Sequence, residues 1–480
     1  MSPDVRKAAR WEMNWSEVAV LDGNAVALGI AESTLMEAAG LALAEAAKEM
    51  AKGAVLVLCG PGNNGGDGFV ASRYLREWGF STAVLASHNN SRGQTAINAR
   101  DSAGEITIWP DKPEGDYSLI VDCLLGAGAG LGDSLRSPIA EVAAWAREMD
   151  VPILACDIPT GLGGPDVLTA DTTITYHSMK QGLHSSMAGE VRVSELPWPA
   201  EVEDCGPGDA KRYPRLDATA RKGDRGRLWV IGGGPYHGAP ILAGMAAARS
   251  GCDLVHVAMP SKSASRAEWP ASLIPEILPD SEMLTEDSLE AISMAFSKRG
   301  ADAVVIGPGL GRDEKTKSAV STILQMAADI GTPVVIDADA ISALPSGKWP
   351  QGLIGVATPH AGEAERWLGE VSASQAVEGC SGEDVVIVVT GAEDLLTGPQ
   401  GRSCKATGGH PRMAVGGTGD LLAGTIGGLL AQGMPAWPAA RLGCALLRQA
   451  GARAAEQAGP GLLAEDVPVE IAKVLREWTV

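Results

Sequence analysis

The stretch VLVLCGPGNNGGDGF, residues 55–69, ends a short apolar run in a loop with five glycines. Gly60, Gly62 and Gly65 match the G-x-G-x-x-G spacing that brings dinucleotide phosphates to a helix N-terminus. That fingerprint also needs an acidic residue about 20 residues further on, after the next strand, to bind the ribose. The next apolar run instead continues into Ser-His-Asn-Asn at 87–90. The loop therefore predicts an anion site that differs from the standard dinucleotide fold.

The same loop carries polar side chains that the dinucleotide fingerprint does not need, at Asn63, Asn64 and Asp67. Asn and Gly tolerate positive φ, so we expect consecutive amides of this loop to turn inward and form an anion nest. The alternative is a glycine-rich turn without a ligand. So many small residues in a row favour the first interpretation.

Further chemical groups follow other apolar runs. Asp122 and Asp157 lie near the ends of strand-length runs, Thr160 follows a proline turn, and His177 and Lys180 follow the run TTITY. The carboxyl ends of parallel strands meet at one edge of a sheet, so these side chains should converge on the glycine loop. One carboxylate there can serve as acid or base while others hold a cation. Each aspartate alone is more typical of a turn or cap, and only the combination indicates a site.

A second glycine loop lies in AVGGTGDLLAG at 414–424. Gly416, Gly417 and Gly419 precede an apolar helical pattern that starts near Asp420, so free amides and the helix dipole should point at a phosphate. Asp420 can take a proton from a hydroxyl group during its phosphorylation. The alternative is a simple N-cap, but an aspartate cap needs no G-G-T-G before it. The chain has no G-x-x-x-x-G-K-[ST] motif, which excludes a Walker-type nucleotidase.

Other polar segments should lie at the same edge as Asp420. They are the glycine turns at 230–240 and 306–312, Asp337 and Asp339 in VIDADA, and His360 and Glu363 in TPHAGE. His360 follows a proline in a strand-to-helix turn, a poor place for a core histidine. We therefore expect His360 to contact a ligand.

Strand-length apolar runs alternate with helical patterns along the chain. The predicted strands are 55–59, 82–86, 118–123, 152–157, 172–177, 227–232, 253–259, 302–307, 333–339, 355–358 and 384–390, and the predicted helices are 67–78, 138–149, 240–250, 314–329, 420–432 and 438–457. Apolar strands separated by helices indicate parallel sheets covered on both faces. The charged, proline-containing run 197–226 marks a boundary. The sequence thus predicts two three-layer α/β domains with mostly parallel sheets, at 1–212 and 213–480.

Composition restricts the classes of partner. The 480-residue chain has a net charge of −20, which disfavours nucleic acid and anionic membrane surfaces. Its eight cysteines form no C-x-x-C pair, so neither a zinc site nor a redox motif is indicated. The apolar run 421–433 is too short to span a bilayer, and its G-x-x-x-G spacing indicates close helix packing. We expect a cytoplasmic protein with small-molecule partners. A homo-oligomer is also expected, although the sequence does not fix the oligomeric state.

Residues 10–210 resemble the NAD(P)H-hydrate epimerases, through VLDGNAVALGI, TLMEAAG, GPGNNGGDGFVASRYL, VDCLLGAG, DIPTGL and TITYHSMK. The resemblance implies a Rossmann-like fold and interconversion of the R and S hydrates of NADH or NADPH. It implies Asp157 as the acid–base residue and a potassium ion held by Asn64, Asp122 and Thr160, where the family more often has Ser at the last position. The implied substrate contacts are Asn63, Asn64, Gly65, Gly66 and Asp67 together with Gly126, Ala127, Gly128, Ala129, Gly130, Leu131 and Gly132.

Residues 222–477 resemble the ribokinase-like NAD(P)H-hydrate dehydratases, through KGDRGRLWVIGG, YHGAP, GPGLG, IDADA, TPHAGE and GGTGDLLAG. That family uses ADP or ATP, with magnesium, to phosphorylate the hydroxyl group of the hydrate, after which phosphate leaves. The resemblance implies Asp420 as the base, Thr390, Gly391, Gly417, Thr418 and Gly419 as nucleotide contacts, and Ala239, Gly309 and His360 as contacts to the hydrate.

One departure from the dehydratase pattern affects the nucleotide site. The family often has Lys-Gly where this chain has Thr390-Gly391, which leaves the choice between ADP and ATP open. Our hypothesis is that Arg412 supplies the missing positive charge.

The predicted function is bifunctional repair of hydrated NADH or NADPH, with epimerisation in the first half and dehydration of the S form in the second. One rival is a small-molecule kinase, for instance of a hydroxymethyl-pyrimidine, with an N-terminal nucleotide-binding regulatory domain. It predicts a stable phosphorylated product. Another rival is a non-catalytic nucleotide sensor, which predicts binding without turnover. The preference between NADH and NADPH, and any channel between the sites, stay open.

Overall fold

The computed structural model describes residues 12–13, 15–215, 217–380 and 382–479. The remaining positions, 1–11, 14, 216, 381 and 480, fall within the predicted domain ranges and lie outside the described residues. The chain divides into two compact units, the first ending at Val202 and the second beginning at Glu203.

Residues 203–212 belong to the second unit because a buried arginine holds them there. Arg441 pairs with Asp209 at 2.5 Å between Nε and Oδ1, and both side chains are almost fully buried. The Arg441 guanidinium also donates to the carbonyls of Glu203 and Asp204, each at 2.9 Å. The unit therefore starts before the boundary predicted from composition.

The first unit contains a seven-stranded sheet in which every neighbouring pair of strands is parallel, in the order β3-β2-β1-β4-β5-β6-β7. The strands are β1 (Ala54–Cys59), β2 (Thr82–Ala86), β3 (Thr107–Ile108), β4 (Tyr117–Cys123), β5 (Ile153–Cys156), β6 (Thr172–Tyr176) and β7 (Glu190–Ser194). The α-helices are α1 (Trp15–Ala27), α2 (Glu32–Met50), α3 (Asn63–Glu77), α4 (Gln94–Ser102) and α5 (Ile139–Arg147). The predicted strands of this half are confirmed as β1, β2, β4, β5 and β6.

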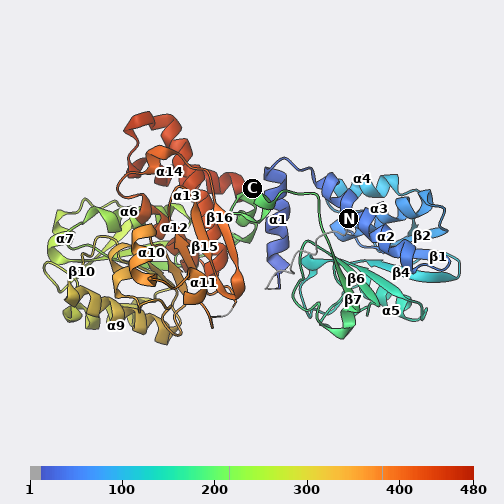
Figure 1. The fold of residues 1–480 in the computed structure, drawn as a ribbon, viewed down its shortest axis with the longest axis horizontal. Helices are drawn as coiled ribbons and strands as arrows, with labels where there is room; N and C mark the ends of the chain where they lie inside the picture. Colours follow the sequence, from blue (N-terminus) through green and yellow to red (C-terminus); the bar gives the residue numbers. More distant parts are fainter. Residues whose placement is uncertain (1–11, 14, 216, 381, 480) are drawn as a thin grey trace. The chain divides into compact units, whose positions relative to one another are not determined.

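Successive residues of β1 point to opposite faces of the sheet, and both faces are covered. Val55 and Val57 belong to a core that includes residues of α2, α3 and α4. Leu56 and Leu58 belong to a separate core that includes residues of α5. Figure 1 shows α5 on the other side of this sheet from α2, α3 and α4. A parallel sheet with helices on both faces confirms the predicted three-layer class for this unit.

The second unit contains a nine-stranded sheet in the order β10-β9-β8-β11-β12-β13-β14-β15-β16, parallel up to β14 and antiparallel beyond it. The strands are β8 (Arg227–Ile231), β9 (Leu254–Pro260), β10 (Leu273–Leu278), β11 (Ala303–Ile306), β12 (Val334–Ile336), β13 (Gly355–Ala357), β14 (Val385–Val389), β15 (Asp394–Thr397) and β16 (Ser403–Ala406). The α-helices are α6 (Gly238–Arg249), α7 (Ser261–Arg266), α8 (Leu289–Arg299), α9 (Glu314–Ile330), α10 (Ala361–Leu368), α11 (Ala373–Ala376), α12 (Thr418–Ala431), α13 (Ala436–Ala458) and α14 (Val467–Thr479).

Two cores flank this second sheet as well. Leu228 and Val230 of β8 share a core with residues of α6, α12 and α13. Trp229 and Ile231 share the other core with residues of α8, α9 and α10. The predicted mostly parallel, three-layer class is therefore confirmed in this unit too.

The strands that the sequence pattern missed lie towards the edges of the sheets. In the edge strand β7, EVRVS mixes charged and apolar residues and no side chain is fully buried. In the edge strand β10, Pro275 interrupts the apolar run, and a proline is tolerated there because only one side of the strand pairs. The antiparallel strands β15 and β16 are only four residues each.

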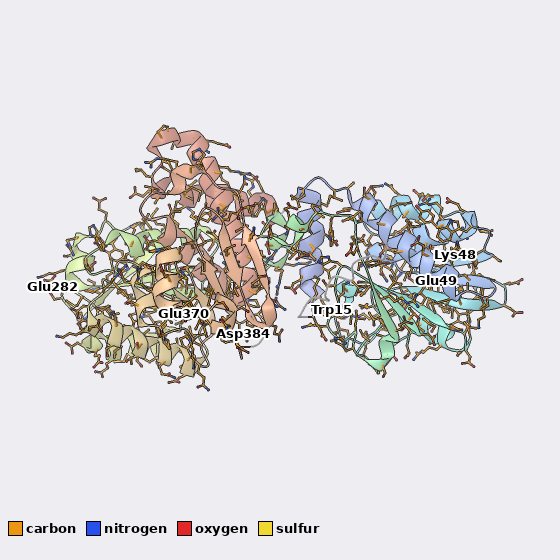
Figure 2. All side chains as sticks on the ribbon, viewed as in Figure 1. Trp15, Lys48, Glu49, Glu282, Glu370 and Asp384 are labelled. Atoms are coloured by element: carbon orange, nitrogen blue, oxygen red, sulfur yellow. The ribbon has the colours of Figure 1, made fainter. Side chains whose placement is uncertain are left out.

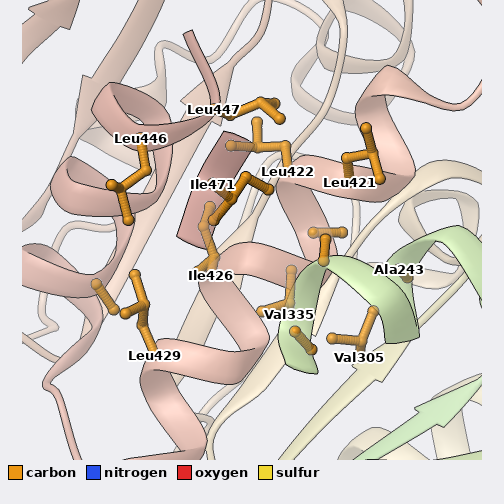
Figure 3. Close-up of a cluster of buried hydrophobic side chains, with 14 of the residues drawn as sticks. Ala243, Val305, Val335, Leu421, Leu422, Ile426, Leu429, Leu446, Leu447 and Ile471 are labelled. Carbon is orange, nitrogen blue, oxygen red and sulfur yellow. The ribbon is translucent and has the colours of Figure 1, made fainter. Parts of the chain in front are cut away.

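The apolar helix α12 crosses the second unit and is buried from Leu421 to Ala431. Figure 3 shows its side chains against those of α13, α14 and β11. A Cβ atom at Gly424 would lie 1.9 Å from the carbonyl oxygen of Ala243, and one at Gly428 would lie 2.2 Å from Ser250 Oγ. The G-x-x-x-G spacing thus marks close helix packing, as predicted. Within the described part of the chain, no helix has the length and apolar character needed to cross a bilayer.

Candidate functional site

The glycine loop after β1 is the start of a helix rather than an anion nest. α3 begins at Asn63, before the predicted start at residue 67. None of the glycines at 60, 62, 65, 66 and 68 has a positive φ, so that expectation is wrong. Their small size is needed for close approach, because a Cβ atom at Gly60 would lie 1.8 Å from the carbonyl oxygen of Leu124 and one at Gly65 1.9 Å from that of Gly60. The free amides of a first helical turn are suited to an anion, and binding of one here stays a prediction.

A cavity of about 600 Å³ opens at the carboxyl edge of the first sheet. Its wall includes Asn63, Asn64 and Asp67 from α3, Gly126, Ala127 and Gly128 after β4, Asp157 after β5, and His177 and Lys180 after β6. Trp15 of α1, labelled in Figure 2, also lines it, with Tyr176 and Trp198. The parallel topology thus brings these segments together. Of the described residues, Gly65, Gly66, Gly130, Leu131 and Gly132 are not part of this wall, and neither are Asp122 and Thr160.

Asp157 is the most firmly held carboxylate of the cavity. Its Oδ1 lies 2.6 Å from Nζ of Lys180, and its Oδ2 accepts from the backbone N–H of Ala127 at 2.9 Å. Lys180 is 1% exposed, and its ammonium also donates to Thr175 Oγ1 at 2.8 Å and to the carbonyl of Tyr176 at 3.0 Å. Asp157 itself has φ +65°, a conformation that non-glycine residues rarely adopt. Residues held in such rare backbone conformations are typical of functional sites.

Of the carboxylates that line this cavity, Asp22, Asp67 and Asp157 interact with one another through their charges. Burial raises the pKa of Asp67 well above its usual range, and the nearby charges of Asp157 and Asp22 raise it further. Burial, with the charge of Asp157, raises the pKa of Asp22 to about 6. Neighbouring carboxylates do not all ionise at neutral pH, so the cavity can both give and take a proton.

Asp22 was not among the predicted site residues, although it lies in the motif VLDGNAVALGI. Its position in α1 shows no strand-end pattern, and only that motif could have pointed to it. The role of Lys180 in holding Asp157 was missed as well, because the spacing places Lys180 after a strand without showing what it contacts.

Of the three candidate cation ligands, Asn64 lines the cavity, whereas Asp122 and Thr160 do not. Asp122 accepts from the backbone N–H of Thr160 at 2.8 Å, from Thr160 Oγ1 at 2.7 Å, and from the backbone N–H of Leu124 at 3.2 Å. Burial raises the pKa of Asp122 to about 6. The side chain of Asn64 lies next to Gly126, where a Cβ atom would be 3.2 Å from Asn64 Oδ1. An all-oxygen set around a buried carboxylate fits a hard cation. The described residues contain no cluster of three or more His, Cys, Asp or Glu side chains able to hold a metal ion.

Replacing Lys180 by methionine is expected to lower the stability of the first unit and the rate of the epimerisation predicted from the sequence. The change leaves the buried Asp157 carboxylate without its cation, and breaking one side of a buried ion pair costs about 3 kcal/mol or more. We expect the melting temperature to fall, and kcat of epimerisation to fall with little change in KM, because Lys180 holds Asp157 rather than the substrate. Lys52→Met on the exposed surface is the matched control. Equal melting temperatures and equal kcat values for both variants would contradict this role.

The second site lies at the carboxyl edge of the second sheet, where β11, β12, β13 and β14 are neighbours. Asp420 is in the first turn of α12. Gly417 caps this helix with φ +101°, and a Cβ atom there would lie 2.5 Å from Leu242 Cδ1, so glycine is required. Cβ atoms at Gly416 and Gly419 would meet no atom within 4 Å. The loop is therefore fixed at Gly417 and open on the side where a phosphate could approach the helix amides.

The half-buried Asp420 and the buried Asp337 have different protonation states. Burial, with the charge of Asp339, raises the pKa of Asp420 to about 6. Burial, with the charge of Asp420, raises the pKa of Asp337 to about 8, while Thr358 Oγ1 donates to Asp337 Oδ1 at 2.7 Å. Asp339 is held by Arg312, with Nε 3.0 Å from Oδ1. At neutral pH Asp420 is ionised and able to act as a base, whereas Asp337 keeps its proton.

His360 is the N-cap of α10. Its Nδ1 accepts from the backbone N–H of Gly362 at 3.0 Å, and its own backbone N–H donates to Glu363 Oε2 at 3.1 Å. The side chain is 57% exposed, which leaves the ring accessible. Capping explains the place of this histidine after a proline, and contact with a ligand stays a prediction.

The segment at Thr390-Gly391 is tied to an arginine that the sequence did not single out. Arg448 of α13 donates to the carbonyl of Gly391 at 2.9 Å and pairs with Asp394 at 2.7 Å. The hypothesis that Arg412 contacts the nucleotide stays a prediction; its Nε donates to the carbonyl of Pro460 at 2.6 Å. Arg448 was missed because it lies inside a long helical pattern, where a charged residue is normally on the solvent side.

The protonated Asp337 should give the second unit a characteristic pH dependence. Between the unfolded pKa near 4 and the folded pKa near 8, the folded state binds one more proton than the unfolded state. This contribution to stability is therefore complete below about pH 4 and is lost as the pH rises towards 8, by about 1.4 kcal/mol per unit. Asp337→Asn keeps an acceptor for Thr358 and removes the titration.

The measurement is denaturant unfolding of both proteins at several pH values from 5 to 8. We expect the stability of Asp337→Asn relative to the unmodified chain to increase with pH. Parallel stability profiles for the two proteins would contradict the protonated state of Asp337.

Comparison with known proteins identifies relatives of both units. Residues 228–473 match the family model described as NAD(P)H-hydrate dehydratase, and residues 32–182 match the one described as YjeF-related protein N-terminus. The chain is 33% identical to the bifunctional NAD(P)H-hydrate repair enzyme of Hyperthermus butylicus, over 96% of this chain and 91% of that protein. It is 35% identical to the enzyme of the same name from Escherichia coli K12, over 81% and 78% of the two chains.

The comparison with solved structures also finds similar proteins. The chain is similar to the ADP/ATP-dependent NAD(P)H-hydrate dehydratase of Bacillus subtilis co-crystallised with ATP and Mg²⁺, with 24% identity and a TM-score of 0.46. The similarity covers 56% of this chain and 96% of that one.

Proposed function

Because this chain belongs to the family of bifunctional NAD(P)H-hydrate repair enzymes, we propose that it restores hydrated NADH and NADPH in two steps. The first unit interconverts the R and S hydrates, and the second dehydrates the S form with ADP or ATP. One observation carries the proposal. Each unit holds an aspartate at the carboxyl edge of its sheet, Asp157 in the cavity wall and Asp420 at an open helix N-terminus.

Epimerisation requires the hydroxyl group to leave the hydrated ring carbon and return on the other face. A proton given by an acid lets the hydroxyl leave as water, and the lone pair of the ring nitrogen stabilises the planar cation that remains. Asp157 is proposed as the group that exchanges this proton, with Lys180 and the amide of Ala127 fixing its two oxygens. The proposed substrate contacts are the residues of the α3 start and of the loop after β4.

A potassium ion is proposed at Asn64, Asp122 and Thr160, whose oxygens fit a hard cation. Bound there, it would supply positive charge beneath the loop after β4. The contacts of Thr160 with Asp122 and with the backbone N–H of Leu125, at 3.1 Å, already fix that loop in the protein itself.

Dehydration requires the hydroxyl group to become a better leaving group. Asp420 is proposed as the base that takes the hydroxyl proton while the oxygen attacks the terminal phosphate of the nucleotide, whose phosphoanhydride bond breaks and releases the shortened nucleotide. Phosphate then leaves the ring carbon, and loss of a proton from the neighbouring carbon restores the dihydropyridine. The amides at the start of α12 stabilise the phosphate charge, and Thr418 holds this turn by donating to the carbonyl of Met413 at 2.7 Å. Magnesium, supplied with the nucleotide, would neutralise the remaining charge. Thr390, Gly391, Gly417 and Gly419 are the further proposed nucleotide contacts, and Ala239, Gly309 and His360 are the proposed contacts to the hydrate.

The deciding experiment mixes the protein with both epimers of NADH hydrate, potassium, magnesium and ADP or ATP, and follows the return of reduced-nicotinamide absorbance. Full recovery, after subtraction of spontaneous epimerisation, supports both activities. Recovery that stops at the fraction of the S epimer would remove the epimerase assignment. A stable phosphorylated product without recovered NADH would favour the kinase rival, and binding without turnover would favour the sensor. The homo-oligomer and the cytoplasmic location stay predictions, which size-exclusion chromatography and cell fractionation would test.

A further inference from the structure

The cavity of the first unit has an unusual charge balance for a phosphorylated substrate. Its wall carries four carboxylates, at Asp22, Glu32, Asp67 and Asp157. Among the described residues that line the cavity, the lysine and arginine side chains are those of Lys180 and Arg92. The ammonium of Lys180 is fully used inside the protein, on Asp157, Thr175 and Tyr176. In a chain of net charge −20, a dinucleotide that enters this cavity therefore depends on Arg92 and on backbone amides for positive charge.

The backbone places Arg92 beside the start of α3. The N–H of Arg92 donates to the carbonyl of Pro61 at 2.6 Å, in the turn that leads into that helix. The next residue, Gly93, caps α4 with φ +83°, and a Cβ atom there would lie 4.0 Å from Asn63 Oδ1. The N-termini of α3 and α4 therefore meet at the wall of the cavity, which Thr95 of α4 also lines.

The side chain of Arg92 differs from the neighbouring arginines because it is exposed and no residue of the described chain pairs with it. Arg73 is bound to Glu37, and Arg76 and Arg100 donate to backbone carbonyls. A second donor in the same wall is also free. Asn64 is only 8% exposed, and its Nδ2 has no hydrogen-bond partner among the described residues. A buried, unpartnered amide normally indicates a missing ligand.

We propose that Arg92 binds the diphosphate of the hydrated dinucleotide, together with Asn64 Nδ2 and the first amides of α3. This inference rests on the proposed epimerase function and adds a residue that sets substrate affinity. A guanidinium group binds phosphate oxygens in a bidentate manner. Two donors beside one helix N-terminus suit two phosphates that share an oxygen, whereas a single 2′-phosphate would need only one of them. Arg92 should therefore raise the affinity for both dinucleotide hydrates over that for the mononucleotide hydrate, without distinguishing NADPH from NADH.

The test compares Arg92→Ala with the unmodified chain, using the hydrates of NADH, NADPH and nicotinamide mononucleotide as probes. For both dinucleotides we expect KM of epimerisation to rise about tenfold or more, as for the loss of a charged hydrogen bond, with kcat nearly unchanged. The mononucleotide should show a smaller rise. Arg92→Lys should recover part of the affinity. Arg147→Ala is the matched control, because Arg147 is exposed and lies on α5, which packs on the opposite face of the sheet.

Several outcomes would overturn the assignment. A rise in KM for the NADPH hydrate alone would indicate a contact with the 2′-phosphate instead. A fall in kcat at constant KM, or unchanged kcat and KM, would also contradict it. Calorimetric titration of the same hydrates into both proteins separates this inference from the proposed function. If the unmodified chain lacked epimerase activity, the proposed epimerase function would be wrong. A tenfold larger dissociation constant for the hydrates in Arg92→Ala would still support the phosphate contact.

Discussion

Asp157→Asn should slow epimerisation by about 10²- to 10⁴-fold, the usual contribution of a positioned acid or base. Asparagine has the same shape but only one acceptor oxygen, so it can keep only one of the two contacts with Lys180 and the amide of Ala127. The first unit should therefore keep its fold but melt at a lower temperature. Asparagine cannot donate or accept the proton that the hydroxyl group exchanges. With both epimers of NADH hydrate present, recovery of absorbance should stop at the fraction of the S form.

The same Asp157→Asn protein provides an internal control, because its dehydratase activity on the S hydrate should be unchanged. Asp150→Asn is the matched control variant, since Asp150 also has a positive φ, +52°, but is exposed and is not in the described wall of the cavity. Complete recovery with Asp157→Asn, at the rate of the unmodified chain, would show that another group exchanges the proton. Asp22 would then be the first candidate.

Asp420→Asn should reduce dehydration by a similar factor of about 10² to 10⁴. The variant keeps the open turn and the helix amides, so ADP or ATP should bind with nearly the same dissociation constant. Epimerisation should continue, and the two hydrates should equilibrate without return of NADH. Asp329→Asn, on the exposed face of α9, is the matched control.

The pH dependence of the unmodified chain gives a second test of Asp420. A base must be unprotonated, and the pKa of Asp420 is raised to about 6, so the dehydration rate should fall as the pH drops below about 6. The residual activity of Asp420→Asn should lack this fall. A variant that kept both the full rate and the acid limb would exclude Asp420 as the base.

The strands of both sheets were predictable because their interior residues are buried on both faces. Runs such as VLVLC read as continuous apolar stretches, and their ends mark where polar side chains converge. The edge strands were not predictable, since their exposed sides allow charged residues and, in β10, a proline.

The start of α3 shows why part of the site could not be read from the sequence. Glycine has a poor helix propensity, so Gly65 and Gly66 argue against a helix there. Packing overrides propensity, because only glycine allows the backbone of α3 to touch the ends of β1 and β4. In the same way, the contacts of Lys180 with Asp157 and of Arg448 with Gly391 depend on the turns between them, which no spacing rule describes.

The buried pair of Arg441 and Asp209 decides where the two activities can be separated by cutting the gene. A fragment that begins at Glu203 keeps every partner of the Arg441 guanidinium, whereas one that begins at Tyr213 leaves that charge buried and unpaired, at a cost of about 3 to 5 kcal/mol. Expression of a free dehydratase should therefore succeed with the ten-residue lead and fail without it. For this protein, the segment that joins two enzymes in the sequence is an integral part of one of them.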